Sequence, residues 1–362
     1  MLCMTHARST EIVRFRGGES VASFAISQGT CVALIPMALA SPLLGLPSMD
    51  ADRDRVEAAL LDAVRTRDAY LTEIASHLIV AGGKRLRPVM TVAAAQVGGQ
   101  SPVSDEVILG GISCELVHLG SLYHDDVMDE SSSRRGVETV NAKWGNLQAI
   151  VAGDFLLARA SEIAASLGNE VSGLLARTIG RLCEGQVEEL RHTYDRGRTV
   201  PSYLVSIQGK TASLFSTSAR IGSLMAGHPR HVTETITNVA DAYGMVFQIV
   251  DDVLDIVATD EQLGKPAGHD LEEGVYTLPV LLTLAADTAE SRELYDLLGS
   301  PLTAKERTKA LKIVRNGNGL ADALDTARSY AAIAESACAH LPPSAATDAL
   351  RRAPRALLDS LD

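Results

Sequence analysis

Residues 107–130 read VILGGISCELVHLGSLYHDDVMDE, and this stretch decides how the chain folds. Nearly every residue before its last turn is apolar or small, and a helix that is apolar on all sides is buried in a protein core. The stretch then ends in carboxylates at Asp125, Asp126 and Asp129. We therefore expect a central helix that brings a cluster of negative charge to one end of the core.

The rest of the chain predicts one all-α domain. Over residues 50–81, apolar residues recur at spacings of three, four and seven, as in an amphipathic helix. Aromatic residues make up only 4% of the chain, too few for a typical β-sandwich core, and no segment alternates convincingly like a strand. Further helices are expected over 89–96, 147–167, 171–191, 201–226, 233–257, 275–286, 304–314 and 319–340.

The first 48 residues are expected to be an extension that precedes a domain of residues 49–362. They carry arginines followed by an interrupted apolar run, Cys31 to Leu46, which is similar to a secretory signal but too broken by proline to span a membrane. Three interpretations stay open: the extension is poorly ordered, it is a secretory signal that is cleaved, or translation starts later, at Met37 or Met49.

The overall charge narrows the class of partner. The formal net charge is −12, which argues against nucleic acid, because a phosphate backbone requires a basic surface. The five cysteines are widely spaced and contain no zinc or redox motif, as in a protein of a reducing compartment.

An acidic segment occurs twice. Residues 124–129 read HDDVMD and residues 250–255 read VDDVLD. Positions four apart share one face of a helix, so Asp125 and Asp129 should point the same way, as should Asp251 and Asp255. Such stacked carboxylates repel one another unless a cation neutralises them.

Magnesium suits these carboxylates best. It binds hard oxygen ligands and typically uses one or two carboxylates together with substrate phosphates. Calcium would require a loop cage that the sequence lacks. A single acidic segment would more simply be a solvated helix end, but two copies that each close an apolar helix favour a metal site.

Basic residues that could bind phosphate accompany the acidic segments. Residues 82–88 read GGKRLRP, which places positive charges on a glycine-hinged turn that enters a helix. His118 lies two turns before Asp125 on the same stripe, where it is either a core residue or a ligand contact. The remaining candidates are Arg134, Arg135, Lys210 and Lys265.

From about Val56 onward the chain resembles the trans-isoprenyl diphosphate synthases, also called polyprenyl synthetases. The resemblance rests on motif segments in a fixed order: 82–88 (GGKRLRP), 122–130 (LYHDDVMDE), 134–136 (RRG), 153–154 (GD), 209–211 (GKT) and 247–255 (FQIVDDVLD). It implies an all-α isoprenoid-synthase helical bundle around a deep central cavity. It also implies a cytoplasmic homodimer whose substrates are isopentenyl diphosphate and an allylic diphosphate.

The resemblance further implies roles for individual residues. The isopentenyl diphosphate site would comprise Lys84, Arg87, His118 and Arg135. Arg134 would bind the allylic diphosphate, together with the catalytic residues Lys210, Thr211, Gln248 and Lys265. Asp125 and Asp129 would hold two Mg²⁺ ions and Asp251 a third, with Asp126, Asp252 and Asp255 acting mostly through water.

The implied reaction is ionisation of the allylic diphosphate, attack by isopentenyl diphosphate, and loss of a proton. Gly120 and Ser121, one turn before Asp125, stand where short-chain relatives carry bulky aromatics, which predicts a product longer than farnesyl. A class I terpene cyclase or a head-to-head synthase would lack the site around Lys84 and Arg87. A non-catalytic partner subunit would be expected to lose aspartates, and this chain keeps all six.

Overall fold

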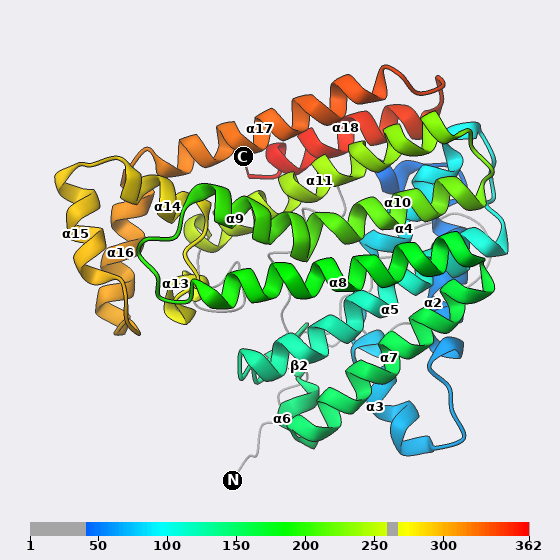
Figure 1. Ribbon diagram of the computed structural model, residues 1–362, viewed down its shortest axis with the longest axis horizontal. Coiled ribbons are helices and arrows are strands. Elements are labelled where there is room, and N and C mark those ends of the chain that lie inside the picture. The colour runs from blue at the N-terminus through cyan, green and yellow to red at the C-terminus, as the bar shows by residue number, and fades with distance from the viewer. Residues whose placement is uncertain (1–40, 259–266, 362) are drawn as a thin grey trace, which may run out of the picture. The chain divides into compact units, whose positions relative to one another are not determined.

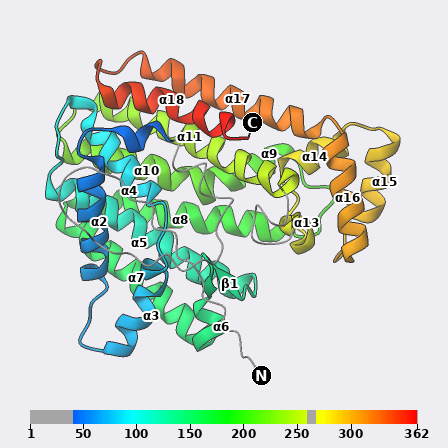
Figure 2. The same ribbon diagram turned by 180° about the vertical axis from the view of Figure 1, so that it is seen from behind.

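The computed structural model describes residues 41–258 and 267–361, and these residues form a helical bundle with a single two-stranded ribbon among them. Figure 1 shows α17 and α18 running along α11 on one side of the bundle, and Figure 2 shows the same arrangement from behind. The prediction of an all-α fold is confirmed.

The elements up to the middle of the chain are η1 (Pro42–Gly45), α2 (Met49–Ala63), α3 (Ala69–Val80), α4 (Leu86–Ala95), η2 (Gln96–Gly98), α5 (Asp105–Met128), β1 (Ser133–Arg134), β2 (Val137–Glu138), α6 (Val140–Trp144), α7 (Asn146–Ser166) and α8 (Asn169–Arg191). Those that follow are α9 (Val200–Ile207), η3 (Gln208–Ala212), α10 (Ser213–Met225), α11 (Arg230–Val257), α13 (His269–Glu273), α14 (Leu278–Ala285), α15 (Ala289–Leu297), α16 (Ala304–Asn316), α17 (Gly319–Cys338) and α18 (Ala345–Asp359).

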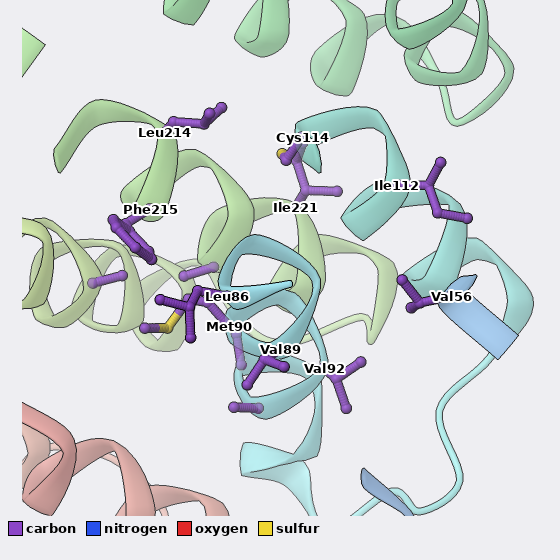
Figure 3. Close-up of a cluster of buried hydrophobic side chains, with 14 of the residues drawn as sticks. Val56, Leu86, Val89, Met90, Val92, Ile112, Cys114, Leu214, Phe215 and Ile221 are labelled. Carbon is purple, nitrogen blue, oxygen red and sulfur yellow. The ribbon is translucent and has the colours of Figure 1, made fainter. Parts of the chain in front are cut away.

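Helix α5 lies at the centre, as its composition predicts. It contacts α2, α4, α7 and α10, and most of its residues before the last turn are buried. Figure 3 shows the core where α4 packs between α5 and α10, with Met90, Ile112 and Phe215 among the buried side chains. Because other helices cover α5 on several sides, its acidic C-terminal end is held firmly in place.

Two of the expected helices are interrupted. Residues 50–81 form α2 and α3 rather than one helix, because the Asp68 side chain accepts hydrogen bonds from the backbone N–H groups of Tyr70 and Leu71 and starts a new helix. Residues 201–226 are divided by η3, a π-helical turn. Gly185 of α8 permits this turn to approach closely, since a Cβ there would lie 2.5 Å from the backbone nitrogen of Lys210.

Residues 41–48, which precede the predicted domain, pack on the bundle: Leu43 is only 1% exposed, and the Gln96 side chain donates to the Pro47 carbonyl at 2.9 Å. Apolar burial therefore holds this segment to the domain. Residues 1–40 lie outside the described part of the chain.

Within the described ranges, none of the helices has both the length and the apolar character needed to cross a bilayer.

Candidate active site

The first acidic segment ends α5, and its three aspartates have different surroundings. Asp126 is fully buried and accepts a hydrogen bond from Arg134 Nε at 2.6 Å, while Asp125 is half-buried and Asp129 lies at the exposed rim. Desolvation, followed by repulsion from Glu273 and Asp125, raises the pKa of Asp129 to about 6. The surroundings of Asp125 and Asp129 therefore disfavour the ionised form of these carboxylates, and a bound cation would stabilise it.

The second acidic segment lies near the end of α11, and two of its aspartates accept hydrogen bonds from other groups of the protein. Asp252 is 4% exposed and accepts from the Tyr203 hydroxyl at 2.6 Å and from Gln248 Nε2 at 2.8 Å. Asp255 is also buried and accepts from backbone N–H groups at the start of α13. Asp251 is the exposed member of this segment.

Lys210 and Glu189 connect the two acidic segments. The Lys210 ammonium donates to the Glu189 carboxylate at 2.7 Å. Burial acts to lower the pKa of Lys210, but the charges of Glu189, Asp125 and Asp129 outweigh it and raise the pKa. Burial raises the pKa of both Asp125 and Asp252, and repulsion from the Glu189 charge raises it further. The two segments therefore share one electrostatic environment across this ion pair.

The carboxylates alone do not form a closed metal cage. Within residues 41–258 and 267–361, no three His, Cys, Asp or Glu side chains lie close enough together to hold an ion by themselves. This donor set fits magnesium, which keeps water ligands and completes its shell with substrate phosphates, better than it fits an ion that requires an all-protein site.

A cationic cluster adjoins the acidic segments on α5. Arg87, Arg134 and Arg135 all lie near His118: burial and then these guanidinium charges hold the pKa of His118 well below its ordinary value. His118 is therefore neutral at physiological pH and can donate or accept one hydrogen bond without adding repulsion. The Arg134 charge also opposes the rise in the pKa of Asp125, so Arg134 lies within electrostatic reach of both His118 and Asp125.

The two inner arginines are held by neutral groups. The Arg87 guanidinium lies 4.6 Å from the centroid of the Phe215 ring, and its buried Nε has no hydrogen-bond partner among the described residues. Arg135 Nη1 donates to the backbone carbonyls of Leu78 and Gly82. Desolvation consequently lowers the pKa of both side chains, and an anion bound beside them would oppose that shift.

Arg85 has a structural role, although it belongs to the same basic motif. Its side chain is 1% exposed and donates to Glu57 at 2.7 Å and to the buried Glu115 at 3.4 Å. Lys84 beside it is half-buried and has an interaction of its own. Of the three predicted charges in this motif, Arg85 is thus satisfied by the protein.

Thr211 and Gln248, two of the predicted catalytic residues, lie together. The Thr211 hydroxyl donates to Gln248 Oε1 at 2.7 Å. Thr211 is placed there by the π-helical turn η3, and irregular turns of this kind are frequent at functional sites. Lys265, the last predicted basic residue, lies outside the described residues.

The predicted chain-length residues lie on α5, and Gly120 has a packing role as well. A Cβ at Gly120 would lie 3.0 Å from the Gly153 carbonyl oxygen and 3.2 Å from Leu157 Cγ, both on α7. Ser121 is half-buried, and its hydroxyl donates to the His118 carbonyl.

The sequence interpretation missed Glu189, Glu115, Tyr203 and Phe215. Each lies in a stretch of expected helix and resembles an ordinary helix residue there. Glu189, at the end of α8, faces Lys210 only because α8 packs against η3. No local pattern signals such contacts, although a carboxylate in the largely apolar segment that contains Glu115 was a clue to a buried ion pair.

Comparisons with known proteins agree with this geometry. Residues 68–314 match the sequence profile of the family described as Polyprenyl synthetase. The chain is 40% identical over 306 residues to a nonaprenyl diphosphate synthase of Mycobacterium tuberculosis (strain ATCC 25618 / H37Rv), covering 84% of this chain and 90% of the relative. It is 41% identical over 241 residues to heptaprenyl diphosphate synthase component 2 of Geobacillus stearothermophilus, covering 66% of this chain and 75% of that one.

Solved structures match as well. A polyprenyl synthase from Caulobacter crescentus CB15, complexed with calcium and isoprenyl diphosphate, superimposes with a TM-score of 0.81 at 35% sequence identity. The match covers 87% of this chain and 96% of that one.

Proposed function

We propose roles for individual residues of this chain, which belongs to the polyprenyl synthetase family and is a trans-polyprenyl diphosphate synthase, a prenyltransferase. The observation that carries the assignment is the Lys210–Glu189 ion pair, which lies within electrostatic reach of both acidic segments. Two diphosphates bound side by side need one cationic site each. We call the group that includes Lys210 the allylic half of the site, and the group that includes Arg87 the isopentenyl half.

The allylic half comprises Lys210, Thr211, Gln248, Lys265 and Arg134, which hold the allylic diphosphate. Asp125, Asp129 and Asp251 would hold three Mg²⁺ ions. When bound, magnesium supplies positive charge that stabilises the leaving diphosphate.

The isopentenyl half comprises Lys84, Arg87, His118 and Arg135. The buried Arg87 Nε has no partner among the described residues, and a guanidinium group already in place binds a diphosphate without first having to reorganise, which reduces the entropic cost of binding. The neutral His118 adds a hydrogen bond where a further positive charge would repel its neighbours.

Together the two halves allow one condensation. The allylic C–O bond breaks and its electron pair leaves on the diphosphate, which Lys210 and Arg134 stabilise. The double bond of isopentenyl diphosphate, positioned by Arg87 and Arg135, attacks the allylic carbon and forms the new C–C bond. A proton then leaves to the released diphosphate, which acts as the base.

The product is a prenyl diphosphate longer than farnesyl. We propose Gly120 and Ser121 as the residues that leave room for the tail, and only Ser121 allows a clean test, because a large side chain at Gly120 would disturb the contact with α7. Ser121→Phe should shorten the product. Unchanged product lengths would place the tail elsewhere.

We further propose a cytoplasmic homodimer. Several large apolar side chains on one face each of α7 and α8 are exposed: Leu147, Ile150, Val151, Val187 and Leu190. Exposed apolar side chains that share one helix face favour association with a second copy. A monomer in analytical ultracentrifugation at micromolar concentration would exclude this.

The functional test uses the purified chain with isopentenyl diphosphate, magnesium and separate allylic primers, followed by sizing of the products. Lys210→Met should lower kcat by about a hundredfold or more, because a charge that stabilises the leaving group is lost. Lys309→Met, which removes a surface lysine paired with Glu293, is the matched control and should have no effect.

A second candidate is the catalytic subunit of a two-component enzyme, because one relative is named component 2 of a heptaprenyl diphosphate synthase. Product formation by the chain alone would exclude it. Product formation only after a second protein is added would support it.

A further inference from the structure

A chain of short hydrogen bonds connects α9, η3 and α11 behind the allylic half of the site. The Tyr203 hydroxyl donates to Asp252 Oδ2 at 2.6 Å, and Gln248 Nε2 donates to Asp252 Oδ1 at 2.8 Å. Gln248 Oε1 then accepts from the Thr211 hydroxyl at 2.7 Å. Tyr203 and Asp252 are 1% and 4% exposed, so water does not compete for these bonds.

The order of donors and acceptors fixes the Gln248 amide. Both carboxylate oxygens of Asp252 accept a hydrogen bond, whereas a side-chain amide has one donating and one accepting end. Asp252 therefore turns the Gln248 nitrogen toward itself and its oxygen toward Thr211. The Tyr203 hydroxyl donates to the second oxygen and so adds a constraint on the rotation of the whole carboxylate about its Cβ–Cγ bond.

We infer that Tyr203 is a positioning residue of the prenyl transfer reaction: through Asp252 it sets the orientation of Gln248 and, through Gln248, that of Thr211. The inference rests on the proposed function, in which Thr211 and Gln248 bind the allylic diphosphate. Hydrogen bonds link Tyr203 to the site through Asp252 and Gln248, so its effect is on the precision of the site.

The competing explanation is that Tyr203 only fills the core. Its ring packs with Ile207, Met245 and Ile249 in a second hydrophobic cluster. Tyr203→Phe keeps the ring and removes only the hydroxyl, so the two explanations predict different results. Tyr276→Phe is the matched control: Tyr276 is a buried tyrosine of the same cluster, but its hydroxyl accepts from the Gly299 backbone N–H.

The test measures the KM of each substrate separately. Tyr203→Phe should raise the KM for the allylic diphosphate roughly 3- to 10-fold, as expected for one lost hydrogen bond, and leave the KM for isopentenyl diphosphate unchanged. Tyr276→Phe should change neither. Calorimetric titration with an unreactive allylic thiodiphosphate should show the same weakening for Tyr203→Phe alone.

A double-mutant cycle with Thr211→Ala separates positioning from a general structural effect. Once Thr211 has lost its hydroxyl, Tyr203→Phe should raise the allylic KM by a smaller factor than it does in the native protein, because only the orientation of Gln248 is then disturbed. The inference is overturned if Tyr203→Phe leaves the allylic KM within twofold of the native value. It is equally overturned if the substitution raises the KM of both substrates alike, or multiplies fully with Thr211→Ala.

The same cycle tests the proposed function independently. If Thr211→Ala alone leaves the allylic KM unchanged, the assignment of Thr211 fails, and the inference about Tyr203 falls with it. If Thr211→Ala weakens allylic binding and Tyr203→Phe does not, the proposed function stands and only the positioning role is refuted.

Discussion

Glu115 offers a quantitative test of the cationic half of the site. Its side chain is 2% exposed and its carboxylate lies 3.4 Å from Arg85 Nη1. Its charge also opposes the burial that lowers the pKa of Arg87 and Arg135. Glu57 binds Arg85 at the shorter distance of 2.7 Å, but it is 44% exposed.

Burial, rather than contact distance, should decide which glutamate contributes more to the free energy of unfolding. At an effective dielectric constant of about 20, unit charges 3.4 Å apart attract by about 5 kcal/mol. Substitution of Glu115 loses this attraction, but it also removes the cost of burying the glutamate charge, which offsets part of the loss. Removing one partner of a buried pair costs about 3–5 kcal/mol, and exposed pairs contribute about 0–1 kcal/mol. We therefore expect Glu115→Gln to lower the free energy of unfolding by about 3 kcal/mol, and Glu57→Gln by about 1 kcal/mol.

Urea denaturation of both variants, with equal m-values as the check on two-state unfolding, measures this difference. Saturating isopentenyl diphosphate should restore part of the stability of Glu115→Gln, because its diphosphate would supply negative charge to Arg87 and Arg135. A loss for Glu57→Gln as large as that for Glu115→Gln would refute the reasoning.

Three further predictions concern stability. Folding lowers the pKa of His118, so the unfolded chain takes up the proton first as the pH falls below about 6.5. The native protein should therefore lose stability from pH 7 to pH 5. In urea titrations, His118→Gln should abolish the part of this pH dependence that His118 causes. Asp129 has a pKa raised to about 6, so Asp129→Asn should stabilise the protein in EDTA at pH 8 by less than about 1 kcal/mol, owing to solvent screening, and give no gain near pH 4. A chain that starts at Met49 lacks the buried Leu43 and Leu46, and its thermal unfolding should reveal a loss of about 3 kcal/mol relative to the full chain; equal stability would contradict the packing of residues 41–48.

Local patterns in the sequence predicted the features that helix geometry controls. The spacing of Asp125 and Asp129 places both on one face of a helix wherever that helix lies, and the apolar stretch before them could only be a core helix. Both expectations agree with the structure.

The remaining features depend on contacts between distant segments. Asp126, Asp252 and Asp255 are buried because Arg134, Tyr203 and the start of α13 bind them, and no short-range pattern specifies these partners. The π-helical turn is equally invisible locally, because it requires the close approach of α8 at Gly185.

The break between α2 and α3 was missed for a different reason. Its signal was present in the sequence: Asp68 is a favourable N-cap residue. The apolar spacing continues across the break, however, and it dominated the interpretation.

The central claim is that carboxylates from α5 and α11 act on one diphosphate between them. A crystal structure with Mn²⁺ and an unreactive allylic thiodiphosphate tests it most directly, since anomalous scattering locates each ion. We predict ions bound to Asp125 and Asp129 on one side and to Asp251 on the other, all contacting the same diphosphate. Ions confined to one helix, or a diphosphate bound away from Lys210, would contradict the account.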